Sequence, residues 1–279
     1  MTGGLSSCFD SITQVPETTR GRTVLAASHG GVYVAHLALQ LRLGGIVVSD
    51  AGVGREGAGV AGLALLDERR VPAAAVSAAS ARIGDGADCL ARGVISFANE
   101  MARGLGVVAG MNAQAAFDRL SLTEREPLWG HASVEESRHD LPKLGGVRLV
   151  IVDSNSLVTM ADKDAIVVTG SHGGLLGGRP ASAIKAPVAA AIYNDAAGGI
   201  DGAGVSRLPA LDTRGIAGAT VSAWSARIGD GQSTYEDGFV THINACAARA
   251  GAEIGMSCRA LVARLAEAAA KRISKGEEA

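Results

Sequence analysis

The sequence contains few aromatic residues and almost no net charge, and both shortages bear on the partners it can bind. Aromatic residues make up 3% of the chain, too few for the stacking platforms that hold single-stranded nucleic acid. The net charge of -2 at pH 7 provides no electrostatic basis for binding a phosphate backbone. We therefore expect no nucleic-acid partner.

Paired cysteines and long apolar segments are missing as well. The cysteines lie far apart and form no CxxC motif, so neither a disulfide framework nor a zinc ribbon is expected. No apolar run approaches the roughly 20 residues of a membrane span. Residues 1–14 lack the basic and apolar regions of a signal peptide. The sequence predicts a cytoplasmic protein with no membrane partner and no cofactor.

Glycine, by contrast, is abundant, and its 38 copies cluster in short loops. One glycine-containing segment, SARIGDG, occurs twice, at residues 80–86 and 225–231. It is the best-preserved part of a longer internal match between residues 49–86 and residues 194–231. A match of this length predicts an internal duplication.

The internal match divides the chain into three parts. A first repeat is expected in residues 1–120, and a second repeat with a C-terminal helix in residues 148–279. Residues 121–147 between them are polar, charged and interrupted by proline, which is typical of a connector. The overall content of 47% apolar residues is that of a globular protein.

Each repeat alternates short apolar runs with helical stretches. The runs, such as LVIV at residues 149–152, are apolar rather than alternating, as expected for parallel strands covered by helices on both faces. Repeated strand–helix–strand units predict an α/β fold with mostly parallel sheet, about four strands per repeat and pseudo-two-fold symmetry. A long helix is expected from Tyr235 to Arg249.

Polar residues shared by the two repeats follow directly after the expected strands. Because ligands of parallel sheets bind beyond the carboxyl ends of the strands, these residues are candidates for a site. A Ser-His-Gly-Gly loop and an Asp loop in each repeat contain the residue types of a nucleophile, a base and an orienting carboxylate. The catalytic candidates are Ser28, His29 and Asp50 in the first repeat and Ser171, His172 and Asp195 in the second.

Ligand-binding candidates lie in the same loops. Glycine-rich turns at residues 51–63 and 196–208 expose backbone N–H groups that attract a carboxylate or phosphate. Neither turn contains a Walker lysine or a clean dinucleotide fingerprint, so we expect a small anionic ligand rather than a nucleotide. Differences between the repeats favour a site formed mainly by residues of the second repeat. The candidates are Gly173, Gly174, Asn194, Ser225, Arg227 and Asp230, with Arg82 and Asp85 in the first repeat.

Each candidate also has a structural interpretation. The Ser-His-Gly-Gly segment can be a tight turn, and Asp50 and Asp195 can cap helices. The arginine and aspartate of each SARIGDG loop can form an ion pair. A further alternative places a divalent metal between the two histidines and these two aspartates.

The segments VVTGSHGG, AAIYNDAAGG and GIAGATVSAW, in this order, resemble the caspase-like fold, including CHAT-type domains. In that family one strand ends in His-Gly, and the next is followed by the nucleophilic cysteine. His29 and His172 match the His-Gly position, whereas alanine or glycine stands at the cysteine position in both repeats. The resemblance therefore implies the sheet topology and argues against cysteine-protease chemistry.

The sequence leaves three functions open. The first, which the matched serine, histidine and aspartate loops favour, is a hydrolase of an amide or related C–N bond in a small anionic metabolite. The second is a non-catalytic metabolite-binding or accessory subunit whose glycine-rich loops hold an anion. The third is a purely structural repeat. Assembly into a homo-oligomer is left open under all three.

Overall fold

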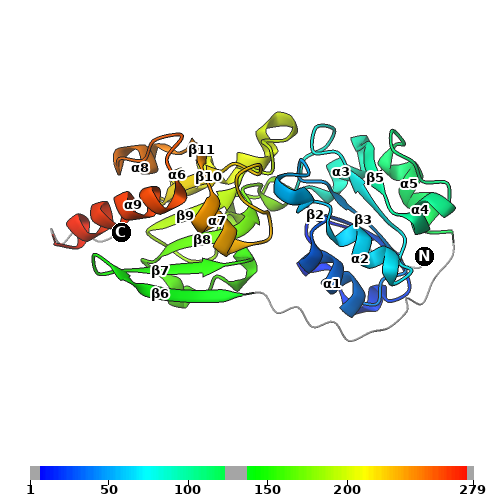
Figure 1. Cartoon of the computed structure of the whole chain (residues 1–279), viewed down its shortest axis with the longest axis horizontal. Coiled ribbons are helices and arrows are strands. Elements are labelled where there is room, and N and C mark those ends of the chain that lie inside the picture. The colour runs from blue at the N-terminus through cyan, green and yellow to red at the C-terminus, as the bar shows by residue number, and fades with distance from the viewer. Residues whose placement is uncertain (1–6, 123–136, 275–279) are drawn as a thin grey trace.

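A computed structural model describes residues 7–122, here called the first half, and residues 137–274, the second half. Each half contains one mixed, mostly parallel sheet with helices packed on it (Figure 1). The predicted α/β class is thus confirmed. Residues 123–136, which make up most of the expected connector, lie outside the described residues.

The sheet of the first half has the strand order β1-β2-β3-β4-β5, in which only β5 is antiparallel to its neighbour. Its strands are β1 (Cys8–Phe9), β2 (Thr23–His29), β3 (Gly45–Ser49), β4 (Ala73–Val76) and β5 (Ile95–Ala98). Its helices are α1 (Val32–Gln40), α2 (Gly62–Glu68), α3 (Gly86–Arg92), α4 (Glu100–Gly104) and α5 (Ala113–Leu120).

The sheet of the second half has the order β11-β10-β9-β8-β7-β6, with β6 and β11 antiparallel to their neighbours. Its strands are β6 (Arg138–Leu144), β7 (Val147–Val152), β8 (Ile166–His172), β9 (Ala190–Asn194), β10 (Ala217–Val221) and β11 (Val240–Ile243). Its helices are α6 (Arg207–Thr213), α7 (Gly231–Asp237), α8 (Ala245–Arg249) and α9 (Cys258–Ser274). None of the described helices combines the length and apolar character needed to cross a bilayer.

Both faces of the central strands of each sheet are buried, which explains why these strands are mostly apolar. On β2, Val24 and Ala26 pack with residues of α1 and α2, whereas Leu25 and Ala27 pack with residues of α3, α4 and α5. Successive side chains of a strand point to opposite faces, so a strand between two helical layers needs an apolar residue at every position.

The prediction of one long helix between Tyr235 and Arg249 is wrong. Helix α7 ends at Asp237, β11 follows, and α8 begins after Asn244. The interrupting segment is rich in β-branched residues and pairs with β10, so tertiary pairing overrides the helical pattern. The side chain of Asn244 then accepts a hydrogen bond from the N–H of Ala247 and starts α8.

The two halves meet through the loops that follow their central strands. The N–H of Arg55 donates to the carbonyl of Ala223 at 2.7 Å, and the N–H of Ile200 donates to the carbonyl of Ala78 at 2.8 Å. These residues occupy corresponding positions of the internal match. A small apolar cluster between the halves contains Ala51, Ile83, Ala196, Ala203 and Ile228. The carboxyl ends of the two sheets therefore face each other.

Candidate functional site

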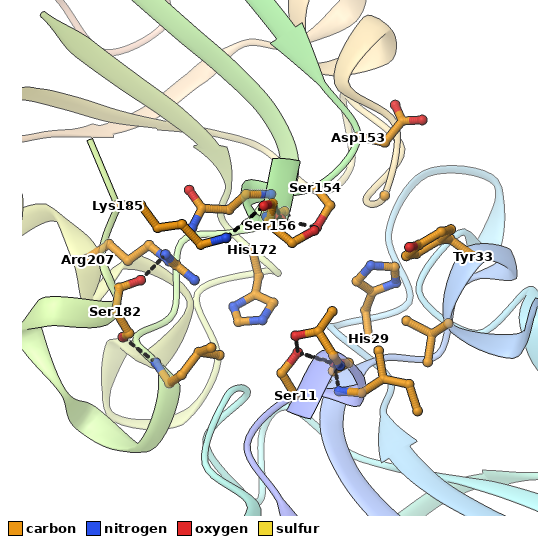
Figure 2. A pocket seen from close by; sticks show the side chains of 18 of the residues that line it. Ser11, His29, Tyr33, Asp153, Ser154, Ser156, His172, Ser182, Lys185 and Arg207 are labelled. Atoms are coloured by element: carbon orange, nitrogen blue, oxygen red, sulfur yellow. Dashed lines mark hydrogen bonds between the residues drawn. The ribbon is translucent and has the colours of Figure 1, made fainter. Parts of the chain in front are cut away.

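A cavity of about 350 Å³ lies between the two halves, where β2 and β8 end (Figure 2). Most polar side chains around it are hydroxyls and imidazoles. Of the predicted catalytic residues, Ser28, His29, Ser171 and His172 line the cavity. Other polar residues of its wall are Ser11, Thr13, Tyr33, Asp153, Ser154, Asn155, Ser156, Ser182, Lys185 and Arg207.

The two histidines approach the cavity from opposite halves (Figure 2). His29 is 9% exposed and His172 6%. Burial lowers the pKa of His29 to about 4. Burial, with smaller contributions from Arg207 and His29, lowers the pKa of His172 well below its ordinary value of 6.5. Both imidazoles are therefore neutral near pH 7.

The hydrogen bonds of the two rings set their tautomer. The N–H of Gly31 donates to Nδ1 of His29 at 3.1 Å, and the N–H of Gly174 donates to Nδ1 of His172 at the same distance. A neutral imidazole that accepts at Nδ1 carries its proton on Nε2. Each histidine therefore presents an N–H donor at Nε2 rather than a base.

Arg207 supplies a buried positive charge to the cavity wall. It is the first residue of α6 and is 3% exposed. Its Nε donates to the carbonyl of Gly174 at 2.9 Å, and its Nη1 donates to the carbonyls of Ser182 and Ala183. The guanidinium stacks over the ring of Tyr193, 5.1 Å from its centre. Among the described residues no carboxylate pairs with it, and burial lowers its pKa.

Lys185 brings a second positive charge to the same side of the cavity. Its side chain is exposed, and its Nζ donates to the carbonyl of Ser156 at 2.8 Å. The hydroxyls of Ser154 and Ser156 lie 2.8 Å apart beside it. Figure 2 shows Lys185 and Arg207 on the side of His172. This wall of the cavity is cationic and rich in hydrogen-bond donors.

The predicted serines do not contact their neighbouring histidines. Oγ of Ser28 accepts the N–H of Ile12 at 3.0 Å, and Oγ of Ser171 accepts the N–H of Asn155 at 2.9 Å. Each hydroxyl thereby anchors the loop that follows the preceding strand of its sheet. A serine–histidine pair of the kind that activates a nucleophile is not formed within either half.

The predicted aspartates stabilise turns rather than line the cavity. Oδ1 of Asp195 accepts the N–H groups of Ala197 at 2.9 Å and Ala223 at 2.8 Å, and Asp50 makes the matching pair of bonds. Neither aspartate contacts a histidine. In residues 7–122 and 137–274, no three His, Cys, Asp or Glu side chains are grouped so as to hold a metal ion. The predicted convergence of two histidines and two aspartates is therefore not formed.

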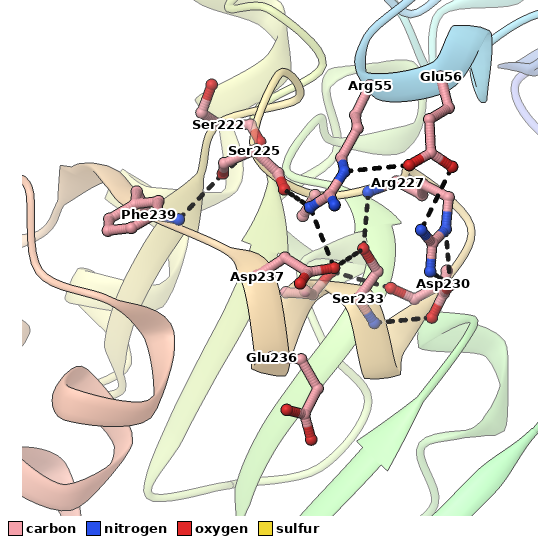
Figure 3. A network of polar contacts seen from close by, with 12 residues as sticks. Arg55, Glu56, Ser222, Ser225, Arg227, Asp230, Ser233, Glu236, Asp237 and Phe239 are labelled. Atoms are coloured by element: carbon pink, nitrogen blue, oxygen red, sulfur yellow. Dashed lines mark hydrogen bonds and ion pairs between the residues drawn. The ribbon is translucent and has the colours of Figure 1, made fainter.

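The SARIGDG loops lie at the junction of the halves and connect them (Figure 3). Of these loops only Gly229 lines the cavity, whereas the predicted Arg82, Asp85, Ser225, Arg227 and Asp230 do not. Arg227 pairs with Asp230 of its own loop at 2.9 Å and with Glu56 of the first half at 3.3 Å. Arg82 pairs with Asp201 of the second half at 2.8 Å, and with Asp88 instead of Asp85. Asp85 and Asp230 accept backbone N–H groups at the starts of α3 and α7.

The remaining ligand-binding candidates also lie outside the cavity lining and maintain loop structure. The side chain of Asn194 bonds to the backbone of Ala196 and Ala226. Oγ of Ser225 donates to the carbonyl of Ser222. The N–H of Gly173 donates to the carbonyl of Asn194, and the carbonyl of Gly174 accepts from Arg207.

The backbone N–H groups of the glycine-rich turns donate mainly to other groups of the protein. In the turn after β3, the N–H groups of Gly54, Gly57 and Gly59 donate to carbonyls of the same turn, and that of Arg55 donates to the other half. Such amides are occupied by the fold, so the donors offered to a ligand are the side chains of the cavity wall.

Arg207 and Lys185 are not among the residues that the sequence singled out. A signal for Arg207 is present in the internal match, where it stands opposite Gly62. Arg207 is buried together with Leu208 and Leu211 of the same helix, and a charged residue at such a position, with glycine at the corresponding one, indicates a role confined to one half.

Comparison with protein-family models, with curated proteins and with solved structures found no match for this chain.

Proposed function

We propose that this chain binds a small anionic metabolite in the cavity between its halves and hydrolyses an amide or related C–N bond in it. The observation that carries the proposal is Arg207, a guanidinium buried to 3% exposure that lines the cavity and forms no ion pair among the described residues. A buried charge without a counter-ion is costly, and an anionic ligand would supply the missing charge.

The donors around the cavity suit the reaction class. Hydrolysis adds the oxygen of a water molecule to the amide carbonyl carbon and places negative charge on the carbonyl oxygen. The C–N bond then breaks as the nitrogen leaves with a proton from that water. Preorganised N–H donors stabilise that oxyanion. The Nε2–H groups of His29 and His172 are such donors, and their neutral rings keep this role across the physiological pH range.

The test is a panel of small carboxylates that carry a carboxamide, an N-carbamoyl group or a cyclic imide. Binding is measured as a rise in melting temperature, and turnover as release of ammonia. Replacing Arg207 by Gln is expected to weaken binding at least about thirtyfold. Arg214→Gln is the matched control, because Arg214 also donates to two backbone carbonyls but does not line the cavity. Equal binding by both variants contradicts the proposal.

A binding protein without catalysis is the second candidate. It is favoured by the hydroxyls of Ser28 and Ser171, which accept backbone N–H groups and have no neighbouring base. This candidate predicts ligands that raise the melting temperature through Arg207 yet release no ammonia. Turnover that disappears in His29→Gln, with the fold retained, would select the hydrolase instead.

A further inference from the structure

The charge around the cavity is distributed unevenly. Arg207 and Lys185 both belong to the second half. The wall formed by the first half consists of hydroxyls, the neutral imidazole of His29 and apolar side chains: its residues are Ser11, Ile12, Thr13, Ser28, His29, Tyr33 and Val34. Figure 2 shows Ser11 and Tyr33 on the side of His29, away from the two cations.

The first half has no room for a counterpart of Arg207. Gly62 occupies the corresponding position, and a Cβ atom there would collide with the main-chain oxygen of Gly31 and approach the methyl group of Ala35 to 2.9 Å. Any side chain at position 62 would have to displace the loop that holds His29. The cationic wall is therefore confined to one half by backbone packing.

The carboxylate of Asp153 in the cavity wall also disfavours binding of a second anionic group. Asp153 uses Oδ1 to accept the N–H of Gly231 at 3.0 Å and Oδ2 to accept the N–H of Ser137 at 2.8 Å. Its carboxylate points away from the two imidazoles (Figure 2). Because both of its oxygens accept N–H groups of the protein, this carboxylate offers no donor to an anion, and a second anionic group would find no partner here.

From this asymmetry we infer that the ligand is a monoanion with one uncharged polar end, bound in a single orientation. Its anionic group lies against Arg207 and Lys185, and its carboxamide or imide carbonyl lies at the wall formed by Ser28 and His29. There Nε2–H of His29 donates to the carbonyl oxygen. The inference rests on the proposed function and narrows its substrate class to ω-amides and related neutral C–N groups of monocarboxylic acids, one molecule per chain.

The test compares three probes of equal length by isothermal titration calorimetry: succinamate, succinate and succinamide. Succinamate is expected to bind at least about tenfold more tightly than either of the others, with one site per chain, because succinate would place a carboxylate on the uncharged wall. The corresponding malonic and glutaric sets cover a shorter and a longer ligand. Succinate that binds as tightly as succinamate, or two sites per chain, overturns the inference.

Lys185→Gln tests the two ends of the ligand separately. Lys185 is exposed and its Nζ makes one hydrogen bond, to the carbonyl of Ser156, so the fold should be retained. The variant is expected to bind succinamate several-fold more weakly and to leave succinamide unchanged. An equal loss for both probes would contradict the assigned orientation.

Failure of the inference can be distinguished from failure of the proposed function. If diacids bind best but still lose affinity in Arg207→Gln, the anion site of the proposed function is retained and the assigned orientation of the ligand is wrong. If no probe of any length binds at millimolar concentration, both proposals are wrong.

Discussion

Gly229 lies against the imidazole of His29, although the two residues belong to different halves of the chain. A Cβ atom added at Gly229 would come within 3.0 Å of Cε1 of His29. Gly84 has the matching relation to His172, at 3.2 Å. Both glycines have a φ above +80°, which other residues rarely adopt. Each SARIGDG loop therefore supports the histidine of the opposite half, which gives the two copies a shared structural task.

Gly229→Ala is expected to displace the ring of His29. The added methyl group meets His29 alone, and the backbone strain should lower the free energy of unfolding by about 1–2 kcal/mol. The displacement is measured as a change in the imidazole NMR signals of His29. Gly251→Ala is the control, because Gly251 has a φ of 85° and no atom within 4 Å of the added methyl. Unchanged His29 signals in Gly229→Ala would show that the loop does not position the ring.

Stability is expected to depend on pH through the two histidines. Their pKa values are lowered in the folded chain, to about 4 for His29, while the unfolded chain titrates near 6.5. Between these values the unfolded chain binds more protons, so the free energy of unfolding decreases as the pH falls from about 6.5 toward 4. Each histidine contributes up to about 1.4 kcal/mol per pH unit in this window.

Urea unfolding between pH 5 and 7 measures this slope. His29→Gln combined with His172→Gln should flatten it, whereas His139→Gln, at an exposed position on β6, should leave it unchanged. A slope that persists in the double variant would assign the pH dependence to other groups.

Substitutions of Asp195 test whether the two aspartates stabilise turns or take part in catalysis. Asp195→Ala removes the acceptor of a buried N–H group, that of Ala223, and of a partly buried one, that of Ala197, and should lower the free energy of unfolding by about 1–3 kcal/mol. Asp195→Asn keeps an acceptor oxygen and should remain within about 1 kcal/mol of the parent chain. Turnover retained in Asp195→Asn supports the turn role. Turnover lost in a stable Asp195→Asn would restore the aspartate as a catalytic carboxylate.

Local patterns in the sequence were sufficient to predict the central strands but not the edge strands. Runs such as residues 149–152 are apolar at every position because helices cover both faces, and they correspond to β7 and its neighbours. Strand β11 is short and edge-placed, so only its pairing with β10 distinguishes it from a helix. Strand β6 lies in the expected connector and is mostly exposed, so it lacks the apolar run of a central strand.

The candidate site was predictable in location but not in composition. Strand ends pointed to Ser28, His29, Ser171 and His172, because parallel strands place their carboxyl ends on one edge. Which atoms of these residues face a ligand depends on hydrogen bonds to the backbone of neighbouring loops. Ser171, for example, is occupied by the N–H of Asn155.

The sequence by itself determined the α/β class, the internal match and the strand ends at which polar residues gather, since these follow from local hydrophobic patterns and from residue identity. Only the tertiary structure decided that the two sheets face each other and that each SARIGDG loop supports the other half's histidine. It also decided that Arg207 enters the cavity wall while Asp50 and Asp195 hold turns. These outcomes depend on contacts between separate segments of the chain, from Asp195 with Ala223 within one half to Arg55 with Ala223 between the halves, which no local pattern encodes.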